Sequence, residues 1–148
     1  MTSPLTLSFG SDHGGFTLRR GLSEALKAKG YAILDRGTET EASCDYPDYA
    51  QAVGADVVSG RAKFGILVCT TGIGISIAAN KVRGIRAALV QNVDAAGLSR
   101  RHGDANVLCF GAKYVDLPTA LACVEVFLTA EFEAGRHARR VDKLESCG

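Results

Sequence analysis

The feature that most constrains the fold of this chain is its regular alternation of short apolar runs with segments of helical periodicity. The clearest run, Phe64-Gly65-Ile66-Leu67-Val68, contains no polar side chain and is typical of a strand covered on both faces. In contrast, Leu18, Leu22 and Leu26 recur at four-residue spacing, which indicates the apolar face of a helix. Alternating strands and helices predict an α/β protein with a parallel sheet and helices on both faces.

The same reading gives the expected elements and domain organisation. Strands are expected at residues 5–9, 31–34, 64–68, 85–90 and 106–110, and helices at 16–29, 47–59, 75–81, 94–101 and 117–130. A chain of 148 residues is expected to form one domain, residues 1–148. Its last part, residues 131–148, is charged and includes Arg136 and Arg140.

Polar and glycine-rich segments follow the predicted strands, where open parallel sheets bind their ligands. Asp12 and His13 follow the first strand, the loop of residues 69–74 follows the third, and Lys113 lies just beyond the fifth. These segments are therefore expected to meet at one edge of the sheet.

The loop Cys69-Thr70-Thr71-Gly72-Ile73-Gly74 is the strongest candidate site. A glycine-rich turn that opens a helix presents backbone N–H groups to an anion. The loop lacks the third glycine of a dinucleotide fingerprint and the Gly-Lys of a P-loop. Ile75 stands where the loop of a cysteine phosphatase would have arginine, so phosphoryl transfer to sulfur is disfavoured.

Proton transfer is the chemistry that remains open to Cys69. A thiolate at a helix N-terminus has a lowered pKa and can act as a base, while neighbouring amides and the hydroxyl of Thr71 stabilise an oxyanion. The alternative is a buried cysteine beside a structural turn, and the loop alone does not decide between the two.

Each of the other candidates also has a purely structural interpretation on sequence grounds. Asp12 and His13 can form an orienting pair, or Asp12 can simply cap the following helix. His102 follows a basic helix end, which needs no catalytic role. Arg136 and Arg140 share a face if the segment is helical and suit a phosphate, or they belong to a solvated tail with His137 as a bystander.

Charge, cysteine content and hydropathy exclude several classes. A net charge of +1 gives no argument for nucleic acid binding. Five cysteines without a CxxC pair argue against a disulfide framework and against a redox protein. No segment resembles a membrane span or a signal peptide, so we expect a cytoplasmic protein with no membrane partner.

Taken together, these motifs resemble the ribose-5-phosphate isomerase B family, which also includes galactose-6-phosphate and allose-6-phosphate isomerases. The resemblance covers nearly the whole chain, and its most specific part is the block of residues 69–81; weaker parts are Gly10 to Gly15, Asp45-Tyr46-Pro47, Gly84 to Ala87, Phe110-Gly111 and Gly135-Arg136-His137. It implies a Rossmann-like three-layer α/β/α sandwich with a five-stranded parallel sheet. It also implies a homodimer or tetramer whose active sites are shared between subunits.

The resemblance implies interconversion of ribose 5-phosphate and ribulose 5-phosphate through a cis-enediolate, with Cys69 as the base. Thr71 and the amides of Gly72, Ile73 and Gly74 would hold the enediolate. His102 would assist ring opening with Asp12 nearby, and Tyr46 would line the sugar site. His13, Lys113, Arg136 and Arg140 would bind the phosphate. No cofactor and no metal are expected, because the loop amides can supply the electrophile.

Two departures from the family pattern leave the sugar open. Gly103 replaces an asparagine that would contact sugar hydroxyls, and Lys113 replaces an arginine, which loses the bidentate fork. The alternatives are a four- or six-carbon sugar phosphate, such as galactose or allose 6-phosphate, and a non-catalytic sugar-phosphate-binding subunit.

Overall fold

The computed structural model describes residues 4–147, and residues 1–3 and 148 of the predicted domain lie outside this range. Five parallel strands form one sheet in the order β2-β1-β3-β5-β4. The strands are β1 (Thr6–Ser11), β2 (Ala32–Asp35), β3 (Phe64–Cys69), β4 (Ala87–Leu89) and β5 (Val107–Gly111). The predicted five-stranded parallel sheet is confirmed.

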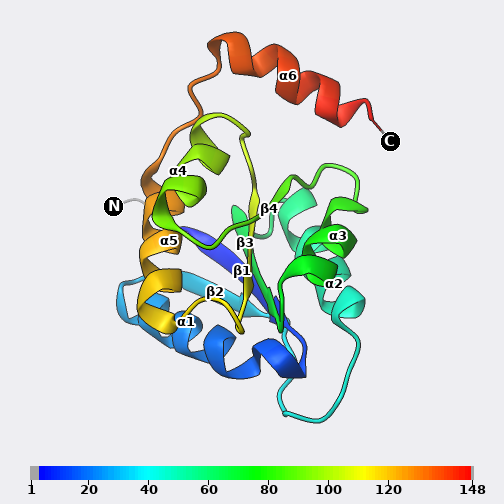
Figure 1. Cartoon of the computed structure of the whole chain (residues 1–148), viewed down its shortest axis with the longest axis vertical. Coiled ribbons are helices and arrows are strands. Elements are labelled where there is room, and N and C mark those ends of the chain that lie inside the picture. Colours follow the sequence, from blue (N-terminus) through cyan, green and yellow to red (C-terminus); the bar gives the residue numbers. More distant parts are fainter. Residues whose placement is uncertain (1–3, 148) are drawn as a thin grey trace.

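Helices cover both faces of the sheet, which gives the predicted three layers (Figure 1). The helices of the sandwich are α1 (Phe16–Ala28), α2 (Tyr46–Val58), α3 (Ile73–Asn80), α4 (Val93–Arg101) and α5 (Leu117–Thr129). One core lies between the sheet and helices α1, α4 and α5, and the other lies against α2 and α3. Every residue of the central strand β3 is buried, as its apolar run predicts.

Local sequence signals explain where the helices begin. The side chains of Asn92 and Asp116 accept hydrogen bonds from backbone N–H groups in the first turns of α4 and α5. Pro47 occupies the first turn of α2, where its missing N–H costs nothing. Within residues 4–147, no helix combines the length and apolarity needed to cross a membrane.

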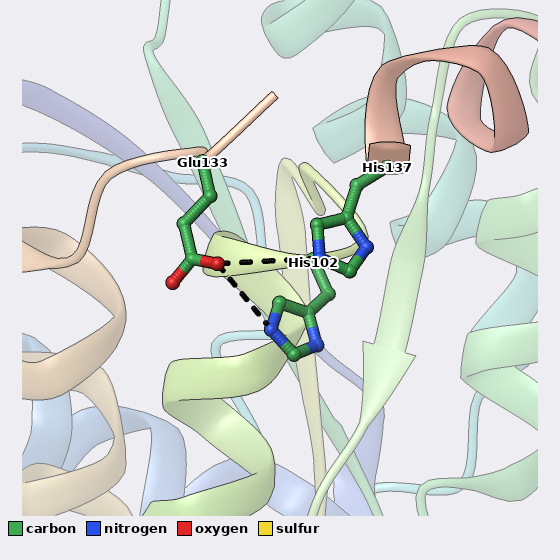
Figure 2. A group of neighbouring side chains, drawn as sticks. All are labelled: His102, Glu133 and His137. Atoms are coloured by element: carbon green, nitrogen blue, oxygen red, sulfur yellow. Dashed lines mark ion pairs between the residues drawn. The ribbon is translucent and has the colours of Figure 1, made fainter. Parts of the chain in front are cut away.

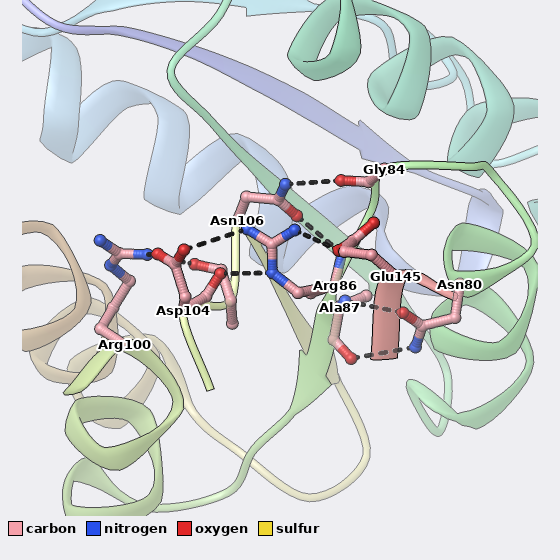
Figure 3. Close-up of polar contacts among 9 residues, drawn as sticks. Asn80, Gly84, Arg86, Ala87, Arg100, Asp104, Asn106 and Glu145 are labelled. Carbon is pink, nitrogen blue, oxygen red and sulfur yellow. Dashed lines mark hydrogen bonds and ion pairs between the residues drawn. The ribbon is translucent and has the colours of Figure 1, made fainter. Parts of the chain in front are cut away.

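The fourth strand is shorter than predicted. The sequence predicts a strand over residues 85–90, but β4 spans only Ala87–Leu89. At this edge of the sheet the side chain of Asn80 pairs with the backbone of Ala87, accepting from its N–H at 2.8 Å and donating to its carbonyl at 3.0 Å (Figure 3). A side-chain amide at the end of α3 thus occupies the place of a neighbouring strand.

The charged C-terminal segment folds as a sixth helix, α6 (Gly135–Glu145), which lies beyond the sandwich (Figure 1). Its only buried residue is Val141, and Glu145 near its end pairs with Arg86 Nη1 at 2.5 Å. Arg86 also donates to the Asp104 carbonyl at 2.8 Å (Figure 3). The helix is therefore attached at its C-terminal end mainly by this ion pair.

Candidate active site

The loop after β3 holds Cys69 against the start of helix α3. Cys69 is the last residue of the strand and is 4% exposed. Gly72 has a φ of 78°, a left-handed conformation that suits glycine, and its N–H donates to Cys69 Sγ at 3.2 Å. The N–H of Ile73 donates to Thr71 Oγ1 at 3.2 Å. A negative charge on the sulfur would therefore face backbone N–H groups at a helix N-terminus.

The residues at the end of β5 hold the Cys69 loop in place. The N–H groups of Ala112 and Lys113 donate to the carbonyls of Cys69 and Thr70 at 3.0 and 2.9 Å. A Cβ atom on Gly111 would lie 2.3 Å from the Thr71 carbonyl oxygen, so only glycine permits this approach. Two neighbouring strands thus determine the position of the thiol.

The turn after β1 packs directly beside the Cys69 loop. A Cβ atom on Gly14 would lie 2.1 Å from Thr70 Oγ1, which shows how closely the two segments approach. Asp12 accepts the Gly15 N–H at 3.2 Å, so it caps the turn, and it also lines the pocket described next. The capping role of Asp12 is therefore observed, and the orienting pair with His13 stays a prediction.

A pocket of about 890 Å³ opens at the carboxyl edge of the sheet, and its size is typical of a small-molecule site. Seven of the predicted site residues line it: Asp12, His13, Tyr46, Cys69, Thr71, Ile73 and Gly74. Gly72 belongs to the same loop as Cys69. A second cavity, of about 750 Å³, lies between the residues around β4 and the end of α6 and contains none of the predicted catalytic side chains.

Cys44 is a pocket residue that the sequence analysis missed. Its N–H donates to His13 Nδ1 at 3.2 Å, which leaves Nε2 as the ring nitrogen available to a ligand. Its sulfur lies 3.9 Å from the same nitrogen, and the side-chain hydrogen bond to Cys44 raises the pKa of His13. Burial acts to raise the pKa of Cys44, but hydrogen bonds with His13 and Tyr49 lower it overall. No sequence motif marks this contact, because the two residues are 31 positions apart.

The remaining thiols behave as predicted where the structure tests them. Cys109 and Cys123 are fully buried in the core. Burial, with a further contribution from Cys69, raises the pKa of Cys109, so this neighbouring thiol stays neutral. Cys147 is exposed.

His102 lies in a different place, at the C-terminal end of α4 (Figure 2). Its ring stacks on that of His137, with centroids 4.1 Å apart and 12° between the planes. His102 Nε2 lies 3.6 Å from Glu133 Oε1, and His137 Nε2 lies 4.0 Å from the same oxygen. Burial, His102 and nearby arginines together lower the pKa of His137. On sequence grounds His137 is expected to be a bystander, and the fold brings its ring onto that of His102.

Of the four predicted phosphate-binding residues, His13 lines the Cys69 pocket, whereas Lys113, Arg136 and Arg140 do not. Arg136 and Arg140 are exposed on α6, and the exposed Lys113 side chain lies over the ring of Tyr114, with Nζ 5.8 Å from its centroid. Within one chain, the predicted residues therefore form two groups: one at the Cys69 loop and one around His102 and α6.

These features define a class of protein: a three-layer α/β protein whose small-molecule pocket is lined by a thiol and by the N-terminus of a helix. The family model described as Ribose/Galactose Isomerase matches residues 7–144, and the chain belongs to this family. The chain is 44% identical over 138 residues to ribose-5-phosphate isomerase B of Escherichia coli (strain K12), with 93% of each chain covered.

Solved structures agree with this assignment. Ribose-5-phosphate isomerase B of Clostridium thermocellum superposes with a TM-score of 0.94 at 48% identity, covering 96% of each chain. The Mycoplasma genitalium enzyme, solved with bound ribulose 5-phosphate, gives 0.92 at 42% identity, covering 98% of this chain and 97% of the other.

Proposed function

We propose that this protein is an aldose–ketose isomerase that interconverts ribose 5-phosphate and ribulose 5-phosphate, with Cys69 as its base. The observation that carries the proposal is the Cys69 thiol, which accepts the Gly72 N–H inside the pocket at the carboxyl edge of the sheet. The activity is that of close relatives in the same family, which cover nearly the whole chain.

The chemistry is a proton transfer between two carbons. The Cys69 thiolate removes the proton from C2 of the open-chain aldose, and the negative charge develops on O1 of a cis-enediolate. Thr71 and the amides of the loop stabilise this oxyanion, while Tyr46 lines the sugar site. The proton returns from the sulfur to C1 and the O2 proton passes to O1, which completes the ketose.

Ring opening and phosphate binding require the second group of residues. We propose that His102, Arg136 and Arg140 serve the pocket of a partner copy in a homodimer, joining His13 and Asp12 there. Their distance from the Cys69 pocket of their own chain supports a shared site, and so does the projection of α6 beyond the sandwich (Figure 1). Lys113 is the remaining candidate for the phosphate. A single domain over residues 1–148, in the cytoplasm, completes the proposal.

The test is an isomerase assay of the purified protein across pentose and hexose phosphates. We expect the highest kcat/KM on ribose 5-phosphate. A higher kcat/KM on a hexose phosphate would make that sugar the assigned substrate. Cys69→Ala should lower kcat by about two orders of magnitude or more, in line with loss of a general base. Cys147→Ala, which removes an exposed thiol, is the matched control and should be neutral. Turnover of none of these sugars would overturn the proposal, as would activity that disappears with a chelator and returns with a metal.

Arg136→Ala and Arg140→Ala should mainly raise KM for phosphorylated sugars, because each removes a guanidinium that pairs with the phosphate. Arg139→Ala on the same helix is the control, since this residue is exposed but was not assigned to the phosphate. An unchanged KM in Arg136→Ala and Arg140→Ala would show that both arginines are solvated surface residues with no role in phosphate binding.

A further inference from the structure

His102, Glu133 and His137 form a cluster that the isomerase chemistry does not fully use (Figure 2). They come from three parts of the chain: the residue that follows α4, the segment between α5 and α6, and the first turn of α6. One ligand-type atom from each lies within 4.8 Å of the others. Two imidazoles and one carboxylate are a donor set that binds first-row transition metals.

The distances in the cluster are too long for hydrogen bonds. Glu133 Oε1 lies 3.6 Å from His102 Nε2 and 4.0 Å from His137 Nε2, whereas N–H···O hydrogen bonds span about 2.7–3.2 Å. Two ligands bound to one tetrahedral Zn²⁺, each at about 2.0–2.1 Å, are separated by about 3.3 Å. The three groups therefore lie close to the separation of ligands around one ion, and small side-chain movements would let all three bind it.

The backbone around the cluster holds it in this arrangement. The Glu133 N–H donates to the Arg101 carbonyl at 3.0 Å, which ties this segment to the residue before His102. Ala134 adopts a φ of 54°, an uncommon conformation for a residue with a Cβ atom, and the next turn places His137 over His102. Strain of this kind persists where the surrounding structure imposes it, often at functional sites.

The charge and exposure of the cluster also permit an ion to enter. The Arg101 side chain faces the other carboxylate oxygen, Oε2, at 3.9 Å, which leaves Oε1 directed at the two rings. The side chains of His102 and Glu133 are 41% and 51% exposed, so solvent can reach the site and supply a further ligand. Arg136 and Arg140 place positive charge nearby, so the Glu133 carboxylate supplies the negative charge that attracts a cation to the cluster.

We propose that His102, Glu133 and His137 form a binding site for a divalent transition-metal ion such as Zn²⁺. Coordination occupies Nε2 of His102, which then cannot donate a proton to a sugar ring. The bound ion is therefore an inhibitor of the isomerase. This consequence rests on the proposed function, whereas metal binding itself does not.

The binding test is a calorimetric titration of Zn²⁺ into the full-length protein without substrate. Cys44 and Cys147 are replaced by serine beforehand, because accessible thiols also bind zinc. We expect one saturable site per chain and a Kd at least about tenfold higher in Glu133→Gln and in His137→Asn. Glu133 is half exposed whereas the His137 side chain is only 12% exposed, so circular dichroism checks that both variants remain folded.

His13→Ala provides the matched control, since His13 is the one histidine outside the cluster. It should leave the Kd unchanged. The proposal is overturned if no saturable binding occurs, if Glu133→Gln and His137→Asn bind Zn²⁺ as tightly as the parent, or if His13→Ala abolishes binding.

The inhibition test uses the same variants in the isomerase assay. Zn²⁺ should inhibit the parent, and Glu133→Gln should require at least about tenfold more of it for the same inhibition. Inhibition of equal strength in Glu133→Gln would show that the ion acts elsewhere and would overturn this consequence. If the protein has no isomerase activity, the proposed function fails while the calorimetric result still decides the metal site.

Discussion

Replacing Gly74 with alanine tests whether the ring of Tyr46 belongs to the active site. A Cβ atom at position 74 would lie 2.4 Å from Tyr46 Cζ and 2.5 Å from its hydroxyl oxygen, whereas ordinary contact begins at 3.4 Å. The ring must therefore move back by about 1 Å. Tyr46 is the first residue of α2 and is 38% exposed, so its side chain can swing toward solvent without disturbing the core.

The expected effects on stability and on catalysis differ. Gly74 is the second residue of helix α3, so alanine is favoured over glycine by at most the value for a helix interior, about 0.8–1.0 kcal/mol, and this gain partly offsets the displaced contact. We expect the free energy of unfolding to change by less than about 1 kcal/mol and Tm by less than about 4 °C. A displacement of about 1 Å of a positioning group lowers kcat/KM by up to about 100-fold. That loss corresponds to about 2.7 kcal/mol of transition-state stabilisation.

The assay is a double-mutant cycle on ribose 5-phosphate with Gly74→Ala, Tyr46→Ala and the double variant. Because the methyl group acts through the ring, Gly74→Ala should have little further effect once Tyr46 is alanine. An equal loss in both backgrounds would mean that the methyl group obstructs the loop amides directly. Unchanged kcat/KM in Gly74→Ala would refute the placement of Tyr46 in the site.

Two further substitutions test the fold that supports the site. Gly72→Ala should destabilise the protein by about 2–5 kcal/mol, from left-handed strain and overpacking against the backbone of β5; a thermal midpoint within about 2 °C of the parent would contradict this. Asp56→Asn should also destabilise it. Burial acts to raise the pKa of Asp56, but hydrogen bonds from Arg36, Ser8 and Arg61 lower it overall. The parent's excess in free energy of unfolding over Asp56→Asn should therefore be complete above about pH 4 and disappear as pH falls through the lower folded pKa. Chemical denaturation at several pH values measures this difference, and a difference that does not change with pH would contradict the prediction.

Much of the fold can be predicted because the strongest sequence signals are those of the core. The apolar run of β3 and the leucine spacing of α1 report burial directly, and both elements appear where expected. The signals weaken where burial is slight. In α6, only Val141 is buried, so periodicity could not distinguish a helix from a solvated segment. At the edge strand β4, the first residue pairs with the side chain of Asn80, a contact that no strand pattern encodes.

The site likewise contains residues that sequence patterns place correctly and contacts that they do not predict. Cys69, Asp12 and Tyr46 flank predicted strands or helices, and the rule that ligands bind at the carboxyl edge brings them together correctly. The contact of Cys44 with His13 and the stack of His137 on His102 connect segments that lie far apart in sequence. Such contacts depend on how loops and α6 pack, which local patterns do not specify.

The position of Cys69 on the central strand has a consequence for the order in which the protein loses function on heating. Strand β3 pairs with a neighbour on each side, so its amides should exchange with solvent only when the whole domain unfolds. Helix α6, held by one buried valine, the ion pair of Glu145 with Arg86 and the stack of His137 on His102, should open locally at much lower cost. Under the proposed function, warming should therefore weaken phosphate binding by α6 well before it disturbs the proton transfer between C1 and C2.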